Sequence, residues 1–307
     1  MNQYPGAVFF VDMLGVGALT QNQIPLCDID FEAWNLKDHP ARSANLLCGR
    51  LLTEFRACLA GVKRSHKSVK VAQLSDCAYI WSSDPAAVFN AARDFMWSSV
   101  EAGILSRGGI SYGEIVEPGK INRSIGHFIL GEAVTRAVGL EKLGKGCRVF
   151  VDNAFLKKSP RDSVFSHDMF KVLKSPLDGT IVNEFCWYGT GRSASRWADA
   201  PHAAAIDVIG ILTRLQYSPR FRWNDSNRHG RIHIACSIDS VSSLTPCFIG
   251  NGNYLFSDDN YVRHLVRPAE RSECNCQKFL SERLADIERF FLKGKLKDPL
   301  QRWLDRN

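Results

Sequence analysis

The chain has 307 residues, which is enough for one elaborated domain or two small ones. Its 45% apolar and 23% charged residues are ordinary for a globular protein, and no stretch approaches the roughly 20 continuous apolar residues of a membrane span. The formal charge of +7 makes a polyanion a candidate partner, but the lack of a long Lys/Arg run argues against stable nucleic-acid binding. The first residues lack the pattern of a secretory signal, so we expect a cytoplasmic protein.

The ten cysteines indicate neither a disulfide framework nor a zinc site. Several lie inside apolar runs or helical patterns, where cysteine is usually a reduced core residue. Cys274 and Cys276 form a lone C-x-C pair without a second Cys/His pair at zinc-ligand spacing.

Strand and helix patterns alternate through the first 195 residues, as judged from apolar periodicity and turn residues. The expected elements, in chain order, are a strand over 7–11, a loop over 21–40, a helix over 41–62, a hairpin of 69–74 and 77–81, a helix over 85–101 with Asp84 as N-cap, a strand over 105–116, a helix over 131–143, and strands over 147–151, 170–173 and 181–188. The order begins βαββαβ, which is ferredoxin-like. We therefore predict an α+β fold with an antiparallel sheet and helices on one face.

The pattern weakens after residue 195, where we expect a helix over 201–216, a strand over 231–238 and an amphipathic helix over 277–293. His229 and His233 are four residues apart, a spacing that suits a metal on a helix but not on the predicted strand. We predict a core over 1–195 and a C-terminal extension over 196–307 that packs on it.

Two acids are the strongest candidates for chemistry. Asp12 ends the first predicted strand, and Asp76 lies in the turn of the hairpin. The ferredoxin-like order places that strand beside the hairpin, so the two carboxylates are expected to face each other. Carboxylate pairs of this kind hold Mg²⁺ or Mn²⁺ together with substrate phosphates. A single Asp at a strand end is more often a turn or cap residue, and only the joint occurrence favours a metal site.

A short glycine-containing turn follows Asp12. Leu14, Gly15, Val16 and Gly17 offer backbone N–H groups with few bulky side chains near the turn. Such a turn is able to cradle the phosphates of a triphosphate.

Four segments in order resemble the class III nucleotide cyclases over roughly residues 6–190. Phe10–Gly15 resembles the F-x-D-I-x-G opening, and Ser75-Asp76 the turn with the second metal-binding Asp. Arg107–Val116 resembles the R-x-G-I-x-x-G-x-V strand, and Gly131–Glu141 the G-x-x-V-N-x-A-x-R-L-E helix. The resemblance implies a cyclase core that closes a nucleoside triphosphate into a 3′,5′-cyclic monophosphate and releases pyrophosphate.

The departures from this family narrow the resemblance. Thr135 and Gly139 stand where the family helix carries its Asn and Arg, and Ala72 and Phe128 stand where purine cyclases read the base. Keeping the metal acids without the purine-reading pair resembles the bacterial pyrimidine cyclases of the Pycsar antiphage system. That resemblance implies UTP or CTP as substrate, two Mn²⁺ or Mg²⁺ ions, a homodimer, and a product read by a separate effector protein.

The resemblance also implies residue roles. Asp12 and Asp76 would hold the metals, with the carbonyl of Met13. With Gly139 in place of the family Arg, Arg136 is the nearest candidate to stabilise charge on the α-phosphate. Further candidates for substrate contacts are Arg50, Ala72, Phe128, Thr135 and the loop Lys120–Arg123.

Three other interpretations stay open from the sequence. One is a palm-type phosphotransferase such as a diguanylate cyclase, although Leu74–Cys77 lacks the expected G-G-D/E-E-F turn. The second is a degenerate cyclase-like module that binds a nucleotide and signals without catalysis. The third is a purine nucleotide cyclase.

Overall fold

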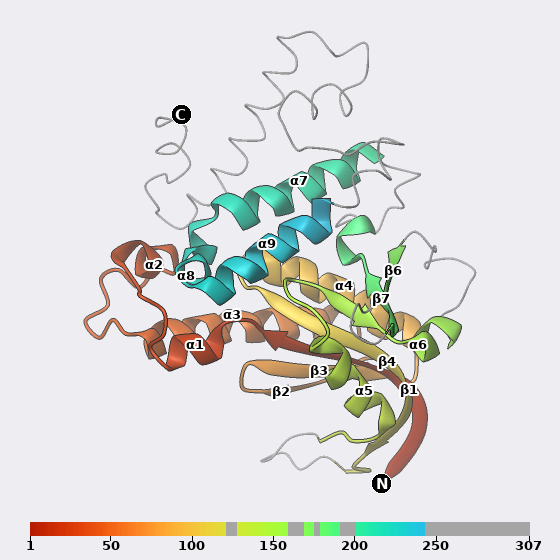
Figure 1. The fold of residues 1–307 in the computed structure, drawn as a ribbon. Coiled ribbons are helices and arrows are strands. Elements are labelled where there is room, and N and C mark those ends of the chain that lie inside the picture. Colours follow the sequence, from red (N-terminus) through yellow and green to blue (C-terminus); the bar gives the residue numbers. More distant parts are fainter. Residues whose placement is uncertain (121–127, 159–168, 175–178, 191–200, 243–307) are drawn as a thin grey trace.

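The computed structural model describes residues 1–120, 128–158, 169–174, 179–190 and 201–242 (Figure 1). The helix predicted over 277–293 lies outside these residues. Within them, no helix is both long enough and apolar enough to cross a bilayer.

The centre of the molecule is one seven-stranded sheet with the order β2-β3-β1-β4-β5-β7-β6. Neighbouring strands are antiparallel, except that β4 and β5 are parallel. The predicted α+β class is confirmed, with a mixed rather than fully antiparallel sheet. The strand bounds are β1 Asn2–Met13, β2 Lys70–Leu74, β3 Cys77–Ser82, β4 Ser106–Glu117, β5 Val149–Val151, β6 Phe170–Lys174 and β7 Ile181–Phe185.

Helices cover both faces of this sheet, so the prediction of helices on one face is wrong (Figure 1). Alternate residues of β1 point to opposite faces. Phe9 and Val11 therefore join the large core under α3 and α4, whereas Val8 and Phe10 pack with α5. The helix bounds are α1 Val16–Thr20, α2 Asp28–Ala33, α3 Ala44–Ser65, α4 Pro85–Ala102, α5 Glu132–Glu141, α6 Asn153–Lys158, α7 Pro201–Tyr217, α8 Arg222–Asp225 and α9 Arg228–Ser242.

The two long helices of the core begin at polar caps. The Ser43 hydroxyl accepts a hydrogen bond from the Leu46 N–H at 3.2 Å. Asp84 accepts from the Ala86 N–H at 2.9 Å, and Pro85 occupies the first helical position, as predicted.

The loop predicted over 21–40 contains a short helix, α2. Its start is fixed locally, because the Cys27 N–H donates to the Asp30 carboxylate at 2.8 Å. Phe31 and Ala33 are then buried in the core. A helix of six residues is too short to show a full apolar period, so the sequence pattern did not indicate it.

The strand predicted over 231–238 is wrong, because these residues belong to helix α9. Ile232 and Ile234 alternate with polar residues and so imitate the period of a strand. Most of the positions that α9 buries are instead small or polar, namely Gly230, Ser237 and Ser240, and only Val241 is apolar. Gly230 is required there, since a Cβ would lie 1.7 Å from the carbonyl oxygen of Asn224.

Helix α5 lies very close to β4 because glycines remove the side chains between them. Gly109 and Gly113 both point toward α5, and a Cβ at Gly109 would stand 2.2 Å from the carbonyl oxygen of Ala137. A Cβ at Gly113 would stand 2.7 Å from the guanidinium of Arg136. This contact sets the position of the whole helix over the sheet.

We expect Gly109→Ala and Gly139→Ala to change stability in opposite directions. The first forces α5 away from β4 and should lower the free energy of unfolding by roughly 2 kcal/mol or more. Gly139 lies in α5 itself, and no atom stands within 4 Å of its Cβ position. Alanine there should raise the free energy of unfolding by about 0.5–1 kcal/mol. Urea denaturation of the two variants checks this. Equal effects would contradict the close contact.

Candidate active site

Asp12 and Asp76 meet at one edge of the sheet. Asp12 lies opposite Cys77 in the β1–β3 register, directly beside the turn that carries Asp76. The Met13 N–H donates to the carbonyl of Asp76 at 2.9 Å, which ties the end of β1 to that turn. Ser75 has a φ of 56°, the left-handed conformation that lets two residues reverse the chain between β2 and β3.

A third carboxylate, Glu141, lies beside this pair. It is buried at the end of α5 and forms an ion pair with Arg107, whose Nε lies 2.6 Å from Oε1. Arg107 stands opposite Asp12 in the β1–β4 register and also donates to the Gly144 carbonyl at 2.6 Å. The sequence pattern alone does not indicate a role for Glu141. The strand register indicates its place, because it puts Arg107 beside Asp12 and Arg107 pairs with Glu141.

These carboxylates give this edge of the sheet an excess of negative charge. Burial and, after it, the charges of Glu141 and Asp76 together raise the pKa of Asp12 to about 7, against a lowering by Arg107. Burial and the same acids raise the pKa of the Cys77 thiol to about 11. Such an edge is stabilised by a proton or by a bound cation.

The donors at this edge fit a hard divalent cation held partly by its substrate. Within the described residues, no three His, Cys, Asp or Glu side chains form an ion-binding group. An ion here would therefore depend on the carboxylates of Asp12 and Asp76, with other oxygens from backbone and substrate. Mg²⁺ and Mn²⁺ are commonly bound in this manner.

The predicted phosphate turn is partly covered. Leu14 and Val16 bury their side chains in the core, whereas Gly17 is exposed with no atom within 4 Å of its Cβ position. Gly15 has a φ of +93°, and a Cβ there would lie 2.6 Å from Oδ1 of Asn224 in α8. The C-terminal extension therefore packs directly on the turn, leaving Gly17 as its open side.

Two predicted cationic residues lie away from the carboxylates in the same chain. Arg136 donates to the Tyr112 carbonyl at 2.6 Å and pairs with Glu132 and Asp152, toward the far end of α5. Arg50 pairs with Glu54 at 2.6 Å on α3. The structure does not bring either one to Asp12.

The remaining predicted contacts lie on the face of the sheet that α5 covers. Ala72 packs at the margin of the small core under α5. Thr135 is exposed on α5, and Phe128 is 47% exposed just before the bridge between Leu130 and Val116. Of the predicted loop Lys120–Arg123, only Lys120 is described, and it is exposed. The rest of that loop lies outside the described residues.

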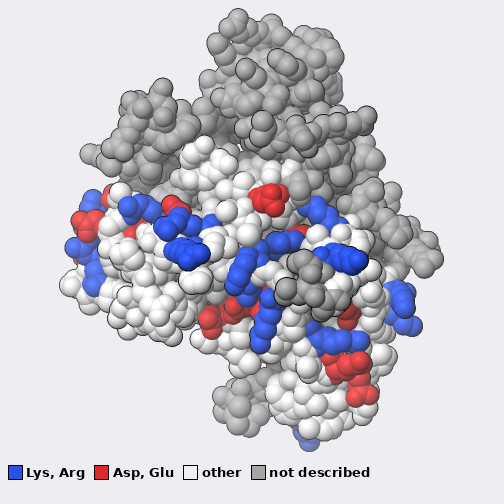
Figure 2. Space-filling model, in the orientation of Figure 1, with Lys and Arg blue, Asp and Glu red and all other residues white. Residues whose placement is uncertain are grey.

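Both signs of charge gather on one face of the molecule. Figure 2 shows groups of acidic side chains next to a band of Lys and Arg side chains that crosses this face. The basic band would attract a polyanion, and the acidic groups would attract cations bound to that polyanion.

No family model matches the sequence, and no curated protein matches it. Solved structures that it resembles include the guanylyl cyclase Cya2, with a TM-score of 0.43 and 12% identity over 60% of this chain and 91% of that one. Adenylate cyclases from Trypanosoma brucei match with a TM-score of 0.43 and 13% identity over 60% and 90% of the two chains. A guanylate cyclase domain from Catenaria anguillulae in complex with GTP matches with a TM-score of 0.41 and 15% identity over 60% and 97%.

We expect Asp12→Asn to stabilise the metal-free protein at alkaline pH. With a folded-state pKa of about 7 against the ordinary 3.8, Asp12 makes the folded protein lose stability as pH rises between these values. In chelator at about pH 8 the variant should exceed the wild type by on the order of 1 kcal/mol, and at about pH 5 the gap should shrink.

Thermal unfolding at the two pH values, with and without Mn²⁺, measures this difference. Mn²⁺ should stabilise the wild type and leave Asp12→Asn unchanged. A wild type that is the more stable protein at alkaline pH in chelator would contradict the raised pKa.

Proposed function

We propose that this chain is a nucleotidyl cyclase that converts a nucleoside triphosphate to the 3′,5′-cyclic monophosphate and pyrophosphate. The observation that carries the proposal is the pair Asp12 and Asp76 at adjacent strand ends, in a half-buried edge with excess negative charge. The four cyclase-like segments support it, because they form β1, the β2–β3 turn, β4 and α5 of a single sheet-and-helix unit.

In this proposal Asp12 and Asp76 hold two divalent cations, with the carbonyl of Met13. When bound, Mn²⁺ or Mg²⁺ would supply activation of the ribose 3′-hydroxyl and neutralisation of the triphosphate. The 3′-oxygen attacks the α-phosphorus and loses its proton to solvent. The bond from the α-phosphorus to the bridging oxygen breaks, and pyrophosphate leaves. The chain contributes mainly by positioning and by a preformed charge arrangement.

We further propose a homodimer with the site at its interface. Arg136 and Arg50 form ion pairs with other acids of their own chain, and in a dimer they would serve the site of the partner subunit. We assign Thr135, Ala72 and Phe128 to the same shared site. Exposed apolar residues support such an interface: Leu74 on the hairpin is 58% exposed, and Phe128 is 47% exposed. Apolar side chains in this position are stabilised by contact with a second protein surface.

For the base we propose a pyrimidine, UTP or CTP. Ala72 and Phe128 carry no charged or amide group for reading a purine edge at these positions. The implied role is a second messenger in bacterial antiphage defence, read by a separate effector protein. Both statements depend on the resemblance of the sequence to pyrimidine cyclases, and the purine cyclase remains the competing substrate assignment.

A second candidate is a cyclase-like module that binds a nucleotide without turning it over. Thr135 and Gly139 favour it, since neither supplies the charge or amide of the family helix.

We expect the purified protein with Mn²⁺ to release a cyclic pyrimidine monophosphate from UTP or CTP in preference to ATP and GTP. Asp76→Ala should lower the rate by at least about two orders of magnitude, because one of the two metal-holding carboxylates is lost. Asp38→Ala, which removes an exposed carboxylate elsewhere, is the matched control and should retain activity.

Product analysis by chromatography and mass spectrometry distinguishes the candidates. A cyclic purine nucleotide would keep the cyclase and overturn the pyrimidine assignment. Mn²⁺-dependent nucleotide binding without any cyclic product would favour the binding module.

A further inference from the structure

Helix α9 accepts hydrogen bonds from two consecutive backbone N–H groups in the loop before β5, and these bonds hold the loop in place. Nδ1 of His233 accepts a hydrogen bond from the Gly146 N–H at 3.0 Å. The hydroxyl oxygen of Ser237 accepts from the Cys147 N–H at 2.7 Å. His233 and Ser237 are one helical turn apart, so a single face of α9 supplies both acceptors.

The same loop holds the charged residues beside Asp12. The Gly144 carbonyl accepts from Arg107, and Arg107 pairs with the buried Glu141 immediately before the loop. Arg107 and Asp12 are cross-strand partners on β4 and β1. A shift of residues 144–147 would therefore move the guanidinium that stands beside Asp12.

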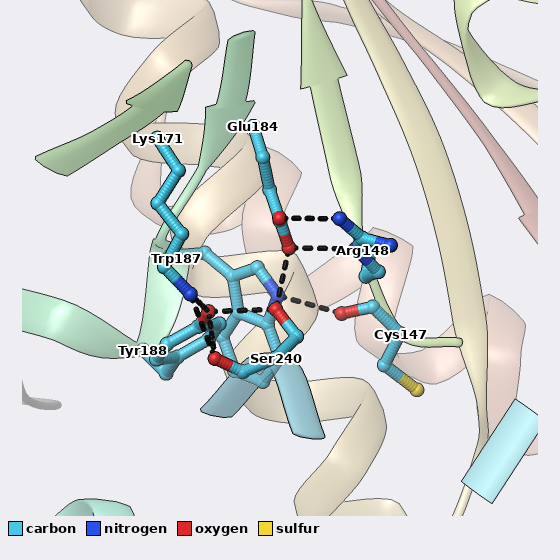
Figure 3. Close-up of polar contacts among 7 residues, drawn as sticks. All are labelled: Cys147, Arg148, Lys171, Glu184, Trp187, Tyr188 and Ser240. Atoms are coloured by element: carbon cyan, nitrogen blue, oxygen red, sulfur yellow. Dashed lines mark hydrogen bonds and ion pairs between the residues drawn. The ribbon is translucent and has the colours of Figure 1, made fainter. Parts of the chain in front are cut away.

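A second set of contacts fixes the other end of α9 to the sheet (Figure 3). The Ser240 hydroxyl bonds to the buried carboxylate of Glu184, which holds Arg148 through two hydrogen bonds of 2.8 and 2.6 Å. The Tyr188 hydroxyl donates to the Ser240 carbonyl at 2.8 Å. These contacts leave α9 little freedom to slide along the loop.

His233 has the protonation state that this contact needs. A ring nitrogen that accepts a hydrogen bond carries no proton, so the proton of the neutral ring is on Nε2. Burial and, after it, the positive charges of Arg107 and Lys145 together lower the pKa of His233 to about 4. The acceptor at Nδ1 is thus available at neutral pH.

We propose that His233 and Ser237 are positioning residues for the Asp12–Asp76 site, through the loop 144–147 and Arg107. This inference rests on the proposed function and deepens it. It assigns a role to the C-terminal extension: α9 fixes the charges next to the metal-holding carboxylates without touching the substrate.

The test compares His233→Ala with His233→Asn, in which the amide oxygen takes the place of the Nδ1 acceptor. His229→Ala is the matched control, since His229 is exposed on the same helix and makes no contact with the loop among the described residues. The readouts are Mn²⁺ affinity by electron paramagnetic resonance, kcat and KM for the triphosphate, and amide hydrogen exchange across residues 106–109 and 144–148.

For His233→Ala we expect Mn²⁺ affinity and kcat each to fall about tenfold, with faster exchange in both segments and KM within about twofold of the wild type. His233→Asn should recover most of both losses, and His229→Ala should match the wild type. Ser237→Ala should show a smaller loss in the same direction.

An His233→Ala variant with unchanged Mn²⁺ affinity and unchanged exchange at 106–109 would overturn the inference. Equal losses in His233→Ala and His233→Asn, in proportion to a lower Tm, would also overturn it, because they would indicate general destabilisation. A wild type that makes no cyclic nucleotide would remove the proposed function alone, since the exchange and Mn²⁺ measurements still decide the coupling.

Discussion

The electrostatic repulsion of Asp12 by Asp76 and Glu141 is the constraint on which the candidate site depends. A folded chain that brings three carboxylates together loses stability unless a proton, Arg107 or a bound cation offsets their charge. Arg107 is committed to Glu141, and its charge only partly lowers the pKa of Asp12. The fold therefore holds an unbalanced negative charge at one sheet edge. Packing of the surrounding elements, rather than attraction between charged groups, keeps the carboxylates there.

That packing comes from the glycines of β4. Because Gly109 has no side chain, the backbone of α5 approaches the strand closely enough to bring Glu141 over Arg107. The same helix presents Thr135 and Gly139 to solvent at the opposite side. One close contact thus determines both which charge lies next to Asp12 and which side of α5 faces solvent.

Sequence patterns predicted the parts of the fold that local chemistry determines. The strand before Asp12, the hairpin around Asp76 and the helix capped by Asp84 all follow from periodicity and turn residues, and the structure contains each of them. Helix α9 was missed because it buries Ser237 and Ser240, which carry no apolar signal. The proximity of Glu141 to Asp12 depends on strand register and helix approach, which no single segment of sequence encodes.

The C-terminal extension contacts the candidate site at two separate points, and this bears on how the chain is divided. Asn224 packs against Gly15 just after the end of β1, while His233 and Ser237 hold the loop next to Arg107. Side chains of α7, α8 and α9, Ile211 and Trp223 among them, belong to the same core as β1 and α4. The backbone N–H groups of Gly146 and Cys147 have their hydrogen-bond acceptors on α9, so this part of the core loop is completed by the extension. The described part of the extension therefore shares one core with β1 and α4, and its contacts with the rest of the chain are those of neighbouring elements within a single packed unit.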